Sequence, residues 1–254
     1  MTQGQALASK PGGWVEAGLT LPVFLTYQIG VHFLSVKNAT DFLTPQLLRV
    51  AGGDAFWYFV YTACIALLWA ASFAIVGWRQ NFAPSKLVQM VCEGAVYGVL
   101  LRQGASWMLG NLGPIAGAVG AVGSVAAPMD ASEAVVLSAG AGFYEELLFR
   151  VLIYGLGAKV LVWWTTREEI ALIGPGVRVS LKSGFVMLAW ASCGATLFAL
   201  AHHLGAGDEA FSFRPFFLRW LLGLAWTGIY VSRGFGAAVW SHAFYDLYVF
   251  LGPG

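Results

Sequence analysis

The sequence predicts an all-α membrane protein, a bundle of seven or eight transmembrane helices around a polar cavity. Hydrophobic residues make up 58% of the 254-residue chain and charged residues only 11%, whereas soluble domains carry about 25% charged residues. Apolar segments long enough to cross a bilayer recur along the chain. We therefore expect one integral membrane domain over residues 1–254, with spans that lack a motif in 1–130 and catalytic core helices in 131–254. A net charge of +1 argues against a nucleic-acid partner.

Three spans are predicted in the N-terminal part, over residues 17–36, 55–78 and 87–110. The second contains no charged residue and measures ~36 Å as a helix, enough to cross the hydrocarbon core with some tilt. The third contains Glu93 and Arg102, whose spacing puts them on opposite sides of a helix. Each of the two can lie near a membrane surface or face the interior of the bundle.

Residues 111–129 are rich in glycine, alanine and valine, which favours a flexible or re-entrant connection; an eighth crossing stays open. The next helix is expected to begin at Asp130, because an acidic cap followed by Glu133 is a helix-start pattern. Its apolar pattern continues to Trp164. A helix of that length measures ~50 Å, so we expect it to tilt, kink or protrude. Small residues at 138–142 predict a close approach of neighbouring helices.

Three further spans are predicted over residues 184–204, 216–232 and 235–251. The positive-inside rule assigns the more basic loops to the cytoplasm. The segments on the side of the N-terminus hold Lys10, Arg79, Lys86, Arg167, Arg178, Lys182 and Arg233, and those on the other side hold Lys37, Arg49, Arg214 and Arg219. This balance favours a cytoplasmic N-terminus.

The candidate site consists of ionisable residues from three of the predicted spans. Such residues are costly in a membrane and mark functional sites. They are Glu145, Glu146, Arg150, His202, His203, His242 and Asp246. Glu146 and Arg150 are four residues apart and share a helix face, whereas Glu145 points ~100° away and stays clear of the arginine. We therefore expect Glu145 to carry the chemistry.

A carboxylate in a low-dielectric cavity is a competent general base near neutral pH. A water molecule between Glu145 and a histidine can attack a carbonyl group, and donors from the last span can stabilise the oxyanion. His242 and Asp246 are four residues apart, so they can hydrogen-bond and set the imidazole tautomer. Ser241 points away from His242, so no acyl-enzyme nucleophile is expected.

Other kinds of protein stay open. His202, His242 and Glu145 can in principle bind zinc, although no His-Glu-x-x-His motif is present, and we expect no metal. A proton-coupled transporter can use the same residues as a relay, but the two halves show no inverted repeat. A non-catalytic membrane partner or immunity protein of the same fold is a further alternative.

Three motifs in one order, Glu145-Glu146-x-x-x-Arg150, Phe198-x-x-x-His202 and His242-x-x-x-Asp246, resemble the CAAX-protease and bacteriocin-processing family of intramembrane glutamic endopeptidases. The resemblance implies a helical bundle with a hydrophilic cavity, no cofactor, and a protein or peptide substrate. It implies that Glu145 and His202 activate water, that His242 and Asp246 form the oxyanion side, and that Glu146, Arg150 and Phe198 support them.

The sequence differs from the eukaryotic members at Asp246, where they tend to carry asparagine. Aspartate donates a hydrogen bond only when protonated, so the residue can instead orient His242. The arginines at 214, 219 and 233 resemble the bacterial branch, some of whose members are thought to remove C-terminal sorting tails in the manner of myxosortases. This resemblance implies a bacterial cytoplasmic membrane and a substrate with a sorting tail or a lipid modification.

Overall fold

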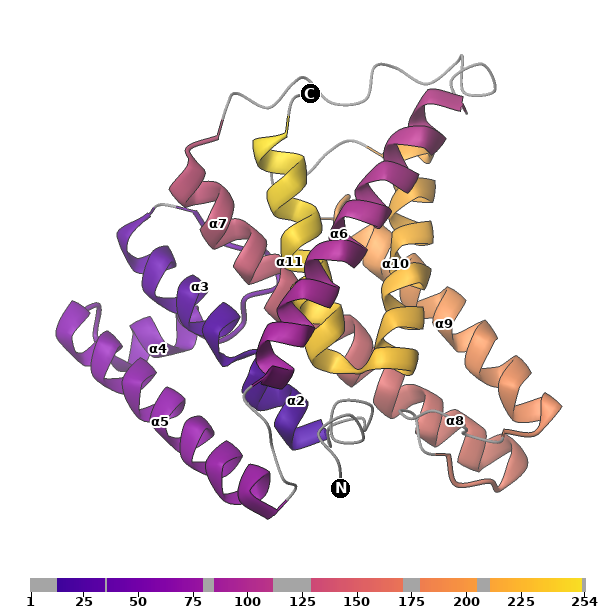
Figure 1. Ribbon diagram of the computed structural model, residues 1–254, viewed down its shortest axis with the longest axis horizontal. Coiled ribbons are helices and arrows are strands. Elements are labelled where there is room, and N and C mark those ends of the chain that lie inside the picture. The colour runs from indigo at the N-terminus through magenta and orange to yellow at the C-terminus, as the bar shows by residue number, and fades with distance from the viewer. Residues whose placement is uncertain are drawn as a thin grey trace.

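The computed structural model describes residues 13–34, 36–79, 85–111, 129–170, 179–204 and 211–252, and within these ranges it contains helices and no strand (Figure 1). The predicted all-α class is therefore confirmed.

The first predicted span is two helices, α2 (Gly13–Leu19) and α3 (Leu21–Phe33), separated at Thr20. Pro22 lies in the first turn of α3, where the missing proline N–H is tolerated but cannot extend the preceding helix. The segment 37–54, between the first two predicted spans, contains the short helix α4 (Thr44–Val50). Asp41 stabilises its start by accepting hydrogen bonds from the backbone N–H groups of Leu43 and Thr44.

Helices α5 (Ala55–Arg79) and α6 (Ser85–Asn111) follow. α5 lies at the outside of the bundle, beyond α3 and α4 (Figure 1). α6 runs through the middle and packs along α11 (Phe235–Leu251), while α10 (Phe213–Arg233) packs against α9 (Leu181–Ala201).

The long helix predicted from Asp130 is present, and its middle is a π-helix. It consists of α7 (Ala131–Gly140), η1 (Ala141–Glu145), η2 (Leu147–Leu156) and α8 (Gly157–Thr166). Asp130 caps it as predicted, accepting from the N–H of Ser132 at 2.7 Å. π-Helical turns are rare and often occur at functional sites. Here they span the segment that contains both adjacent carboxylates.

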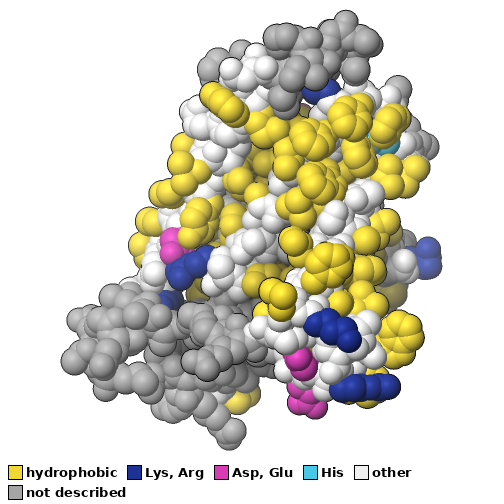
Figure 2. All heavy atoms as spheres, turned by 90° about the vertical axis from the view of Figure 1, so that its right-hand side faces the viewer, with side chains coloured by type: hydrophobic (Ala, Val, Ile, Leu, Met, Phe, Trp, Pro, Cys, Tyr) yellow, Lys and Arg dark blue, Asp and Glu magenta, His cyan; other side chains and the backbone are white. Residues whose placement is uncertain are grey.

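Among the residues that the structure describes, three helices are long and apolar enough to cross a membrane, over Ala55–Ile75, Ala131–Thr166 and Leu181–Ala201. Hydrophobic side chains cover much of one face of the molecule, and charged side chains gather mainly toward its lower part in Figure 2. Phe185 and Leu188 of α9 are both more than two-thirds exposed, as expected for lipid contacts. These features indicate a membrane protein, whereas seven or eight spans and an inner-membrane location stay predictions. Residues 112–128 lie outside the described ranges.

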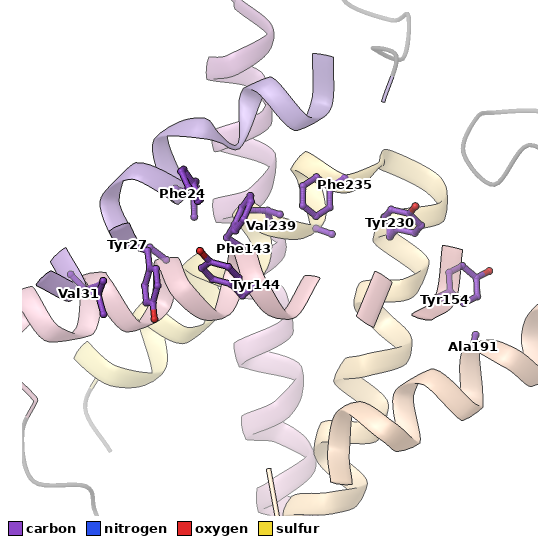
Figure 3. Close-up of a cluster of buried hydrophobic side chains, with 14 of the residues drawn as sticks. Phe24, Tyr27, Val31, Phe143, Tyr144, Tyr154, Ala191, Tyr230, Phe235 and Val239 are labelled. Carbon is purple, nitrogen blue, oxygen red and sulfur yellow. The ribbon is translucent and has the colours of Figure 1, made fainter. Parts of the chain in front are cut away.

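The core joins α3 to the π-helical segment and to α11. Phe24 packs on Phe143 with ring centroids 5.2 Å apart, and Tyr27 packs edge-on against Tyr144 at 5.3 Å (Figure 3). Phe235 of α11 closes the same cluster. The N-terminal helices are thus packed directly on the helix that carries the candidate acids.

The predicted small-residue contact occurs at Gly140 and Gly142. A Cβ atom on Gly142 would lie 2.8 Å from the Val239 carbonyl oxygen and from the Ala243 Cβ. A Cβ atom on Gly140 would overlap the Tyr27 ring. Glycine here allows α3 and α11 to approach the helix next to the acids.

Candidate active site

Glu146 and Arg150 form a buried ion pair, as their spacing predicted. Arg150 Nε lies 3.1 Å from Glu146 Oε2, and both side chains are almost completely inaccessible. The guanidinium also lies 4.6 Å from the centre of the Phe198 ring and 5.7 Å from that of Trp226. Two aromatic faces and a carboxylate therefore compensate the arginine charge.

His242 is held by Glu146 from the opposite helix. Its Nδ1 lies 2.7 Å from Glu146 Oε1, and Trp226 stacks on the imidazole with centroids 3.8 Å apart. Asp246 Oδ2 is 3.6 Å from His242 Nε2, beyond hydrogen-bonding distance. The expected hydrogen bond between His242 and Asp246 is therefore wrong: Glu146, on the facing helix, reaches Nδ1 and sets the tautomer instead.

His202 lies at the C-terminal end of α9, where its Nδ1 is 2.9 Å from the Phe198 carbonyl oxygen. A carbonyl oxygen only accepts, so Nδ1 carries the proton and donates it. In a neutral ring Nε2 is then an acceptor. This nitrogen faces Glu145 Oε2 at 4.0 Å.

Glu145 has two oxygens in different environments. Oε1 accepts a hydrogen bond of 2.9 Å from Asn38 Nδ2. Oε2 is buried and accepts no hydrogen bond from the part of the chain that the structure describes. It lies 4.0 Å from His202 Nε2 and 3.9 Å from His242 Nε2. One carboxylate oxygen thus faces two imidazole nitrogens at a separation that a single water molecule can bridge.

Asn38, from the connection between α3 and α4, is a site residue that the sequence analysis missed. Its Oδ1 accepts from the Thr40 N–H at 2.8 Å and from the Thr40 hydroxyl, which points Nδ2 toward Glu145. Its backbone N–H donates to the Tyr27 hydroxyl at 3.0 Å. In the sequence, Asn-x-Thr is typical of an ordinary turn, so only the fold reveals its contact with a residue 107 positions away.

A cavity of about 540 Å³ contains the candidate site. Glu145, His202, His242 and Asp246 all line it, together with Phe198 and Trp226. Its remaining walls are largely apolar, and α6 and α10 add charged residues to them. His203, about 100° from His202 by helical spacing, does not line this cavity but packs beside Phe211. Among the described residues, no group of three or more His, Cys, Asp or Glu side chains can hold a metal ion.

Residues 128–248 match the model of a family described as Rce1-like, type II CAAX prenyl endopeptidase. This similarity to a family of membrane proteases confirms the resemblance predicted from the three motifs. The match includes Glu145, His202, His242 and Asp246, but neither Asn38 nor α6. No curated protein and no solved structure matches the chain.

Proposed function

We propose that this protein is an intramembrane glutamate-dependent endopeptidase that cuts a peptide bond near the C-terminus of a membrane-associated or sorted protein. The observation that carries this proposal is the placement of Glu145 Oε2 3.9–4.0 Å from the Nε2 atoms of His202 and His242. The family match supports proteolysis as the reaction class.

The nucleophile in this proposal is a water molecule between Glu145 and His202. Both facing atoms, Oε2 and Nε2, are hydrogen-bond acceptors, because Phe198 holds the His202 proton on Nδ1. A water molecule that donates one O–H to each keeps a lone pair for attack on the substrate carbonyl. As the C–O bond forms, the water proton passes to Glu145, and Glu145 later gives it to the leaving amide nitrogen as the C–N bond breaks.

The oxyanion side is assigned to His242 and Asp246. Since Glu146 occupies Nδ1 of His242, Nε2 donates to an oxyanion only when the ring is protonated. Protonated Asp246 can donate as well, and its Oδ2 lies 3.6 Å from the same nitrogen. In this proposal Glu146 holds His242 and Phe198 holds His202, while Arg150 packs against both of these supporting residues.

The substrate class we propose is a polypeptide with a C-terminal sorting tail or a lipid modification. The cavity has the volume of a pocket for a small ligand, which suits a short peptide segment and not a folded domain. Its largely apolar walls suit a segment that enters from the bilayer. The reaction uses no cofactor in this proposal.

The test is cleavage of candidate tail peptides by purified protein in liposomes. We expect Glu145→Gln and His202→Ala each to lower kcat about 10²–10⁴-fold, the usual range for a general base. Glu169→Gln, on an exposed loop, is the matched control and keeps full activity. Persistent cleavage in both active-site variants contradicts the assignment. Loss of activity on adding a chelator, restored by zinc, supports a metalloprotease, and no cleavage by the unaltered protein supports a non-catalytic partner.

For orientation we propose a bacterial inner membrane with a cytoplasmic N-terminus and a cavity open to the periplasm, on the basis of the loop charges. Cys64, Cys92 and Cys193 are exposed, so they are replaced before a single probe is added. Phe211→Cys, at an exposed position before α10, should then react with an impermeant thiol reagent from the periplasmic side. Reaction only after the membrane is opened contradicts this orientation.

A further inference from the structure

Two arginines lie on the cavity wall outside the predicted catalytic group. Arg102 comes from α6 and Arg219 from α10, and both line the cavity that holds Glu145 and His202. Ionisable residues in a membrane bundle are functional candidates by default. Arg102 was compatible with a membrane-surface position on sequence alone, and the structure directs it inward.

The packing of α6 explains the position of Arg102. Gly94, Gly98 and Arg102 are spaced by four residues, so they share one face of the helix. A Cβ atom on Gly94 would lie 2.5 Å from the Trp240 Cβ, and one on Gly98 would lie 2.9 Å from the Phe244 Cβ. The two glycines bring α6 against the backbone of α11, and the next turn places Arg102 in the cavity near Tyr245.

The face of α10 that carries Arg219 also carries Trp226, the residue stacked on His242. Pro215, Arg219, Leu222 and Trp226 follow helical spacing and all line the cavity. Arg219 interacts electrostatically with His202 and Asp246. Along α10, Arg219 lies about two helical turns before Trp226.

Cations exceed acids on the cavity wall. Three basic residues line the cavity, Lys37, Arg102 and Arg219, and two acidic residues, Glu145 and Asp246. Arg102 donates to the neutral hydroxyl of Ser106. Within the described ranges no carboxylate lies within ion-pair distance of Arg102. A cation so placed in a low-dielectric site favours an anionic ligand.

We propose that Arg102 and Arg219 bind the C-terminal carboxylate of the substrate peptide and so hold the scissile bond beside Glu145. This inference rests on the proposed function. The planar guanidinium matches a carboxylate through two parallel hydrogen bonds, and the shared cavity keeps the bound terminus close to the catalytic group. The enzyme would then recognise the end of a chain and reject internal segments.

The experiment compares two peptides of one sequence, ending in a free carboxylate or in an amide, in neutral detergent without anionic lipid. We expect the unaltered protein to cleave the acid with a kcat/KM 10–100-fold above that of the amide, mainly through KM. Arg102→Gln should remove this preference by weakening cleavage of the acid alone. Arg102→Lys, which keeps the charge but not the planar guanidinium, should show an intermediate preference for the acid over the amide. Arg49→Gln, at an exposed position on α4, is the control and keeps the preference.

Binding provides a second readout that needs no turnover. In a Glu145→Gln background the acid peptide should bind 10–100-fold more tightly than the amide, and Arg102→Gln or Arg219→Gln should abolish the difference. Binding of this kind without any cleavage by the unaltered protein contradicts only the proposed function. Equal binding of acid and amide, or an equal loss of both in the arginine variants, overturns the carboxylate site. If the molecule bound at these arginines is displaced by anionic lipid but not by the acid peptide, the arginines bind a lipid headgroup. This result also overturns the carboxylate site.

Discussion

The N-terminal and C-terminal parts of the chain meet at one cavity but contribute different kinds of residue. The family match covers residues 128–248, which supply both carboxylates, both imidazoles and the ion pair with Arg150. The unmatched N-terminal part supplies Asn38, which orients Glu145, and Arg102, which adds positive charge to the wall. The C-terminal part thus carries the groups that we propose to be catalytic, and the N-terminal part adds a hydrogen bond to Glu145 and a charged residue to the cavity wall.

The largest effect on stability is expected inside the C-terminal part, at Glu146. Glu146→Ala leaves the buried guanidinium of Arg150 and the buried imidazole of His242 without their shared partner, which costs about 3–5 kcal/mol of unfolding free energy. Unfolding in mixed micelles measures this loss. Glu93→Ala breaks the partly exposed pair with Arg233 and should cost only about 0–1 kcal/mol.

A double variant separates stability from activity at this pair. Replacing both charges, as Glu146→Leu with Arg150→Met, should recover much of the stability lost in Glu146→Ala, because apolar residues can replace a buried ion pair. Activity should stay low, since His242 loses its hydrogen bond to Glu146. Recovery of both stability and activity in the double variant is the result that disproves this role for Glu146.

The next largest effect is expected at a contact between the N-terminal and C-terminal parts. Asn38→Ala removes the hydrogen bond to Glu145 Oε1, and bonds to charged groups are worth about 1.5–3 kcal/mol. We expect kcat to fall about 10–100-fold in the tail-cleavage assay, with little change in KM. Asn111→Ala, an exposed asparagine at the end of α6, should have no effect. Unchanged kcat in Asn38→Ala would restrict the site to the matched residues.

Helix approach next to the acids gives a third comparison. Gly142→Ala places a Cβ atom 2.8 Å from the Val239 carbonyl oxygen and the Ala243 Cβ, so α11 must shift. Overpacking of this kind costs about 1–3 kcal/mol, measured as a lower midpoint of unfolding. Gly104→Ala, on a part of α6 with open space around the glycine, should not destabilise the protein. Equal effects of the two substitutions contradict the close contact.

The smallest effect concerns an acid of the C-terminal part that lies outside the cavity. Hydrogen bonds from Ser183 and Ser180 hold the pKa of Glu168 below its usual value. A lowered pKa stabilises the fold above the pKa of the unfolded state, and this contribution disappears as the pH falls through the folded value. The midpoint of thermal unfolding should therefore fall slightly less on acidification in Ser183→Ala than in the unaltered protein. Cleavage should be unchanged. An identical acid profile contradicts this coupling.

Local spacing made much of the C-terminal site predictable. Asp130 as a helix cap and Glu146 paired with Arg150 both follow from residues two to four positions apart on one helix, and helical periodicity determines such contacts. The order of the three motifs on successive apolar helices likewise led to the family that residues 128–248 match. The all-helical class followed from composition and the length of the apolar segments.

Tertiary structure alone decided the contacts between distant residues. Glu146 replaces Asp246 as the hydrogen-bond partner of His242 across 96 positions, and Asn38 reaches Glu145 across 107. The direction of Arg102 depends on the close packing of α6 on α11. These contacts depend on how helices pack against one another, and helical periodicity does not encode that packing. Sequence therefore identified the ionisable groups of the three motifs, whereas packing brought Asn38 and Arg102 to the cavity and decided which groups touch.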